Sequence, residues 1–242
     1  MTASAGTSAF GTFLFWNGAK VLELSNISGP TETRNTIDVT SHDSDDAYSE
    51  FIAGVGDGGE ISIDGNLITT DSAGQVAFHT DLQAGTKRTG FIVLPMALGK
   101  AFTFTGMGSG FSGSYPYDDK ASVSGTVKVS GKPTYLTTQS TGISALSGIE
   151  EIDTAALSLN EVVAAGTYAY TCTVDTDSSW VKLTVTAADH TIYVNGTAQT
   201  TTVQGGEIAL GAAGTTTEIT ILVYETSKAP RVYTLSVTRP AA

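Results

Sequence analysis

The segment of residues 37–66 constrains the fold of this chain more than any other. An alternating strand pattern runs into a long acidic stretch, and a Gly-rich turn then leads into a second alternating pattern. Loops of this length are uncommon inside compact domains and are usually functional or disordered. The side chains of Tyr48, Phe51 and Ile52 interrupt the polar stretch. We therefore expect this loop to dock on a partner surface.

The composition predicts a protein made mainly of β-strands. Of the 242 residues, 27 are glycine and only 15% are charged. This profile is typical of all-β chains with many turns, and a hydrophobic fraction of 40% suffices for a core. Asn17 with Gly18, and Asn195 with Gly196, follow apolar runs and predict tight hairpins.

Residues 71–84 are the one good helix candidate. Ser72 and Gln75 stand at the spacing of a capping box, and Gly85 takes the place of a glycine that ends a helix. We expect a single helix beside the sheet.

Charge and cysteine content exclude several classes of protein. A net charge of −12 argues against a chain that grips nucleic acid, because phosphate contacts need a basic patch. An acidic balance is equally common as a solubility device. Cys172 is the only cysteine, so no disulfide can form within the chain. We expect it to be an inert, buried thiol.

No set of residues predicts catalysis. The three histidines, His42, His79 and His190, are far apart and lack metal-ligand spacing. The Gly/Ser-rich stretch 106–113 lacks the strand–turn–helix context of a nucleophile elbow. The acidic residues within 43–57 lack the helices and closing Glu of an EF-hand. We expect no catalytic residue, cofactor or metal, and therefore no enzyme.

The start of the sequence shows no charged segment followed by an apolar run, and no apolar run reaches membrane-spanning length. We expect neither export by a signal peptide nor membrane insertion.

The composition changes near residues 131–147, where a polar, small-residue stretch is typical of a linker. We place the linker at about 132–142 and predict two domains, residues 1–138 and 143–242. Six or seven short strands in the second domain indicate a β-sandwich, with Trp180 in its core rather than forming a platform for sugar. The stretches 143–146, 192–197 and 233–239 resemble the cadherin-like, Ig-like β-sandwich modules of bacterial and phage surface proteins.

The first domain resembles the tail tube proteins, or major tail proteins, of phages with long non-contractile tails. The runs 38–43 and 51–54 carry the resemblance, together with the order hairpin, strand, long loop, strand, helix and paired strands. The resemblance implies a β-sandwich or barrel subunit with one flanking α-helix. It also implies hexameric rings that stack into a tube, and hence a virion protein made in the host cytoplasm.

The same resemblance implies a set of partners. Copies of the chain itself come first, followed by tail terminator, distal tail and tape measure proteins. DNA would pass through the lumen without specific binding. The second domain would decorate the outside, be dispensable for tube growth and contact the host surface weakly. A two-domain surface adhesin or carbohydrate-binding protein remains the alternative.

Two loops are the predicted contact sites. The first, expected to bridge one ring to the next, contains Thr40, Ser41, His42, Asp43, Asp45, Asp46, Tyr48, Glu50, Phe51 and Ile52. The second is the Gly/Ser/aromatic stretch 106–119, with Phe111, Tyr115 and Tyr117 as anchors. These aromatic residues would either hold a partner or pack on their own domain, and the sequence favours neither.

Overall fold

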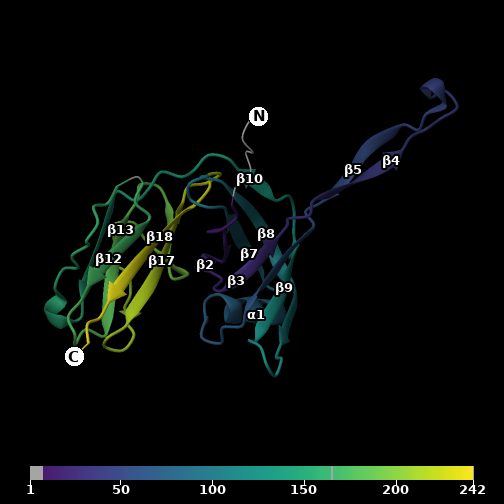
Figure 1. The fold of residues 1–242 in the computed structure, drawn as a ribbon. Coiled ribbons are helices and arrows are strands. Elements are labelled where there is room, and N and C mark those ends of the chain that lie inside the picture. The colour runs from purple at the N-terminus through teal and green to yellow at the C-terminus, as the bar shows by residue number, and fades with distance from the viewer. Residues whose placement is uncertain (1–7, 165, 242) are drawn as a thin grey trace, which may run out of the picture. The chain divides into compact units, whose positions relative to one another are not determined.

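The fold was analysed in a computed structural model that describes residues 8–164 and 166–241. The protein is mainly β, as predicted, and the described residues contain one α-helix. The chain divides into two compact units (Figure 1). We call Val21–Gly90 with Thr103–Thr134 the helix-bearing unit. We call the described residues up to Lys20, together with Phe91–Phe102 and the chain from Tyr135, the sandwich unit.

One sheet has the strand order β2-β1-β7-β8-β9-β6-β3, and β10 pairs with β8. The bounds of these strands are β1 Phe13–Trp16, β2 Ala19–Lys20, β3 Leu24–Ser28, β6 Glu60–Asn66, β7 Lys87–Val93, β8 Ala101–Ser114, β9 Ser122–Val129 and β10 Thr134–Leu136. Asn17 and Gly18 both have positive φ in the turn between β1 and β2, which confirms the predicted hairpin.

The helix α1 (Gln75–Ala84) packs on the sheet of the helix-bearing unit through Phe78, which is fully buried. Its close approach depends on glycines in the strands below. A Cβ on Gly108 would lie 2.9 Å from Leu82, and one on Gly125 would lie 3.2 Å from Phe78. The Gly-rich stretch 106–114 is therefore strand β8 and not the loop that its composition predicted.

The start of α1 is held by a buried carboxylate. Asp71 accepts hydrogen bonds from the backbone N–H of Leu22 (3.1 Å), Gly74 (3.1 Å) and Gln75 (2.9 Å). The predicted capping box of Ser72 is wrong, because the helix begins at Gln75 and Asp71 satisfies its first donors. Gly85 is left-handed at the helix end, as predicted.

The sandwich unit contains two further sheets, with strand orders β11-β13-β16 and β12-β18-β17-β14-β15. Their bounds are β11 Ala145–Glu150, β12 Ala169–Thr173, β13 Trp180–Thr186, β14 Thr191–Val194, β15 Thr197–Gln199, β16 Ile208–Ala209, β17 Thr216–Tyr224 and β18 Arg231–Thr238. Cys172 is buried in the core, as predicted, and burial raises its pKa to about 11.

Trp180 does not lie in the core of this unit, contrary to prediction. On β13 the buried side chains are Val181, Leu183 and Val185, so Trp180 lies on the opposite, partly exposed face. The Lys182 Nζ stands 4.7 Å from the centre of its ring. Side chains along β13 alternate between its two faces, so the face opposite to the buried one carries Trp180.

The β1–β2 hairpin packs against the C-terminal strands within the sandwich unit. A Cβ on Gly18 would lie 2.3 Å from the Tyr193 ring, and one on Gly196 would lie 2.6 Å from Ala19. Behind these two turns lies a shared apolar cluster made of Phe15, Phe91, Val93, Ala101, Leu136, Leu222, Ala229 and Val232. The hairpin and the C-terminal strands therefore form one hydrophobic core.

The predicted linker contains β10 and is then fastened to the sandwich by Glu225. This carboxylate accepts hydrogen bonds from the Thr141 N–H and hydroxyl, both at 2.7 Å, and from Lys228. His190 Nε2 lies 3.2 Å from it. Lys228, followed by Thr141, lowers the pKa of Glu225 to about 2.

We expect Glu225→Gln to lower the thermal unfolding midpoint at pH 7. The folded pKa of about 2 lies below the ordinary 4.5, so this stabilisation is present above pH 4.5 and is lost as the pH falls towards 2. The difference in midpoint between variant and wild type should therefore shrink over that range, as measured by scanning calorimetry. Glu218→Gln, on an exposed position of β17, is the control. A difference that persists unchanged at pH 2 would contradict the expectation.

Candidate functional site: a projecting arm and the notch at its base

Residues 33–57 of the helix-bearing unit form a slender two-stranded ribbon, which we call the arm. Strand β4 (Thr33–Asp38) pairs with β5 (Phe51–Asp57), and a short 3₁₀ turn (Asp45–Ala47) lies at the tip. Figure 1 shows the arm extending away from the strands and helix of its own unit. Every residue of β4 is exposed, and so is every residue of β5 except Gly54.

The arm corrects one detail of the sequence analysis. Residues 54–57 of the predicted Gly-rich turn, together with Phe51 and Ile52, belong to strand β5. Only Gly58 and Gly59 remain as the connection to β6. Position 54 favours glycine because a Cβ there would lie 3.1 Å from the Asn35 carbonyl oxygen, which is a tight contact. The loop proper is therefore shorter than residues 40–59.

Apolar side chains are exposed on the arm without a core beneath them. Ile37 pairs directly with Ile52, so both side chains share one face, and they are 50% and 53% exposed. Phe51 is 58% exposed and Tyr48 is 76% exposed. The apolar residues predicted as anchors are thus free to contact a partner.

Local hydrogen bonds give the tip a defined shape. Thr40 N–H donates to Asp38 Oδ1 (2.8 Å), and Thr40 Oγ1 accepts from the Glu50 N–H (2.9 Å). Ser41 N–H donates to Ser44 Oγ (3.0 Å). The hydrogen bond from Thr40 lowers the pKa of Asp38, so this carboxylate stays ionised. The remaining predicted residues at the tip all have exposed side chains: His42, Asp43, Asp45, Asp46 and Tyr48.

The second predicted contact stretch is divided by the structure. Phe111 lies in β8, partly buried, with its ring centre 4.9 Å from that of His79 and 6.2 Å from that of Phe78. It therefore packs on its own unit beneath α1. Tyr115 and Tyr117, by contrast, are exposed at the turn that joins β8 to β9.

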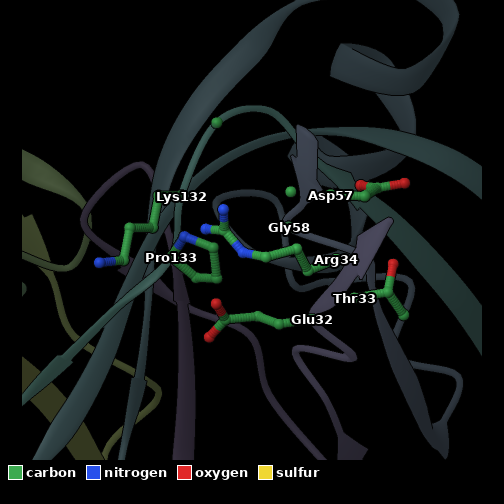
Figure 2. Close-up of a pocket in the computed structure, with 9 residues that line it drawn as sticks. Glu32, Thr33, Arg34, Asp57, Gly58, Lys132 and Pro133 are labelled. Atoms are coloured by element: carbon green, nitrogen blue, oxygen red, sulfur yellow. The ribbon is translucent and has the colours of Figure 1, made fainter. Parts of the chain in front are cut away.

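A cavity of about 380 Å³ opens where the arm joins the body, and we call it the notch. Figure 2 shows the Arg34 side chain reaching toward Pro133, with Glu32 alongside. The lining residues are Glu32, Thr33, Arg34, Gly56, Asp57, Gly58, Gly131, Lys132 and Pro133. Sequence patterns do not predict this site, because its residues come from stretches that only the fold brings together.

Ion pairing fixes the charge of the notch. Lys128 Nζ lies 2.8 Å from Asp57, and this contact lowers the pKa of the Asp57 carboxyl. Arg34 donates to the Gly54 carbonyl at 3.2 Å. Lys132 is exposed and has no acidic partner within 4 Å among the described residues. The notch is therefore lined by two cations, Arg34 and Lys132, and by one carboxylate, Glu32, that forms no ion pair among the described residues.

Two classes of feature are absent from the part of the chain that the structure describes. It contains no cluster of three or more His, Cys, Asp or Glu side chains able to hold a metal ion. It also contains no helix of the length and apolarity needed to cross a membrane.

Comparisons with known proteins give two results. Residues 154–240 match the model of the cadherin-like β-sandwich domain family. No curated protein sequence matches the chain.

Three solved structures share a partial likeness with the chain. The virion of a native gene transfer agent particle aligns at 17% identity and a TM-score of 0.46, over 54% of this chain and 98% of that one. The tail of an empty gene transfer agent particle with C6 symmetry aligns at 18% and 0.45, over 54% and 98%. A six-fold symmetrised anti-feeding prophage baseplate aligns at 10% and 0.43, over 56% and 97%. At these TM-scores none of the likenesses establishes a shared fold. The family match confirms that the chain carries a cadherin-like β-sandwich domain in its C-terminal part.

Proposed function

We propose that the protein is a structural component of a phage-type tail, in which copies of the chain form hexameric rings that stack into a tube for DNA. The observation that carries this proposal is the unpartnered arm. A two-stranded hairpin alone is marginally stable in water. This hairpin also exposes Ile37, Phe51 and Ile52, which a partner surface would cover.

Self-association is the simplest way to supply that partner. A contact between two different surfaces of the same chain repeats head-to-tail, and it closes into a ring or grows as a filament. The arm places such a surface far from the body. Strand β4 with the two residues that follow it, Thr33 to Thr40, spans roughly 26 Å at 3.3 Å per residue. A compact unit of about 100 residues has a radius of gyration of about 13 Å, so the arm extends about twice that radius.

One face of the sheet suits the lining of a DNA channel. Glu60, Ser62 and Asp64 on β6 lie opposite Lys128, Thr126 and Ser124 on β9, on the face away from the core. Hydrogen bonds from Ser124 and then Asn26 lower the pKa of Asp64, which keeps it charged. Lys128 is neutralised by Asp57. A face with paired cations and free carboxylates would not retain a phosphate backbone.

Deleting residues 43–50 tests the proposal. We expect wild-type protein to form tubes visible by negative-stain electron microscopy, and the deletion variant to remain folded but form none. Circular dichroism and thermal unfolding establish that the variant is folded. Tubes of normal length from the deletion would refute the role of the arm. A wild-type protein that stays monomeric at high concentration would refute the proposed function and favour the adhesin.

A pair of matched double variants sharpens this test. Ile37→Ser with Ile52→Ser removes apolar groups from the arm, whereas Val162→Ser with Val203→Ser removes exposed apolar groups elsewhere. Only the first pair should shorten or abolish the tubes.

A further inference from the structure

We propose that the notch of one copy receives the arm tip of a second copy. The inference rests on the proposed self-assembly and names the surface that would seat the arm. It follows from the charge, the reach and the hollow shape of the described residues.

The tip is strongly acidic and has no cation of its own. The sequence contains no Lys or Arg between Arg34 and Lys87, whereas the tip carries Asp43, Asp45, Asp46 and Glu50. Two tips would repel each other, because like charges brought together at an interface are unfavourable. The tip therefore needs a cationic surface.

Such surfaces are scarce in a chain with 24 acidic and 12 basic residues. Of the six Lys and Arg residues in the helix-bearing unit, Arg88 and Lys128 are held by Asp81 and Asp57. Arg34 and Lys132 line the same cavity. Among the described residues of this unit, the notch is therefore where two cations without a carboxylate partner within 4 Å come together, with Glu32 as the one unpaired carboxylate beside them.

The shape of the notch also suits the tip. A cavity of about 380 Å³ accepts an aromatic side chain, and Tyr48 at the tip is 76% exposed. Within this cavity the Arg34 guanidinium can stack on an aromatic ring and bond a carboxylate at the same time.

Reach selects a second copy as the occupant. The extended strands of the arm hold its tip far from the notch at its own base (Figure 1). In a head-to-tail stack the tip of one copy lies level with the notch of the next when the repeat equals the arm length. That length, roughly 26 Å, is about twice the radius of gyration of a compact unit of about 100 residues.

Cysteine cross-linking tests the docking in full-length protein. Tyr48→Cys protein is mixed with Lys132→Cys protein, and disulfide-linked dimers are followed over time. The native Cys172 does not compete, because it is buried and its pKa is raised to about 11. The control mixture pairs Lys132→Cys with Val162→Cys, a position that is 83% exposed.

We expect the dimer between the Tyr48→Cys and Lys132→Cys chains to form at least about tenfold faster than the control dimer, since docking raises the effective concentration of the two thiols. Equal rates, or preferential linkage of two Tyr48→Cys chains to each other, would overturn the inference. This readout does not need tubes. A rapid link between positions 48 and 132 in protein that forms no tubes would keep the docking and reject the tube.

Charge reversal gives the complementary result in the assembled state. Arg34→Glu with Lys132→Glu, and separately Asp43→Lys with Asp45→Lys and Asp46→Lys, should each abolish tubes. Combining all five substitutions in one chain should restore them. Normal tubes from the notch variant would reject the docking while leaving tube formation intact.

Discussion

Phe15→Ala is expected to lower the free energy of unfolding by about 3–5 kcal/mol, the usual cost of removing a buried aromatic ring. The Phe15 side chain is fully buried in the cluster that joins the β1–β2 hairpin to Leu222, Ala229 and Val232. Its removal would leave a cavity between segments from opposite ends of the chain. Urea denaturation followed by fluorescence measures the change.

Phe10→Ala is the matched control, because Phe10 is 93% exposed and should change stability by less than about 0.5 kcal/mol. A similar small effect at Phe15 would mean that the hairpin and the C-terminal strands do not share a core.

The same cluster bears on the expectation that the second domain is dispensable for tube growth. Removing residues 143–242 would expose Phe15, Phe91 and Val93, which are now at most 5% exposed. We therefore expect the truncated chain to aggregate instead of forming tubes. The C-terminal strands therefore supply part of the hydrophobic core that buries the β1–β2 hairpin.

Asp71→Ala is expected to cost about 3 kcal/mol, because it leaves two buried backbone N–H groups and one partly buried N–H group without an acceptor, at about 1–3 kcal/mol for each buried group. Those donors belong to Leu22, Gly74 and Gln75. The loss should destabilise α1 and the chain segment that leads to β3. Thermal and urea unfolding provide the measurement.

Asp71→Asn keeps one acceptor oxygen and should fall between wild type and the alanine variant. Asp43→Ala, on the exposed arm tip, should leave stability unchanged. If Asp71→Ala proved as mild as Asp43→Ala, water or backbone movement would have replaced the cap.

Local patterns in the sequence predicted the features that depend on neighbouring residues. The alternation of β6 and β9 and the positive φ of Asn17 with Gly18 follow from short-range sterics and burial. The left-handed Gly85 at the end of α1 is another example. The mainly β class and the C-terminal sandwich were predicted for the same reason.

Features that depend on residues distant in the sequence could not be predicted from local patterns. The glycines of β8 are typical of a loop when the sequence is considered alone. Gly108 is required because the Leu82 side chain of α1 occupies the space that a Cβ would need. The notch combines Arg34 with Lys132, and no local pattern connects these two residues. The prediction for Trp180 was wrong because it relied on the apolar character of tryptophan and not on the alternation of side chains along β13.

The position of the notch at the root of the arm has a consequence for any stack of these subunits. At one extremity the arms would have no neighbour to bind, and at the other extremity the notches would be unoccupied. Such a polymer has a direction, so elongation and termination at its two extremities call for different molecular surfaces. An acidic protrusion suits the partner at one extremity, and a basic hollow suits the partner at the other.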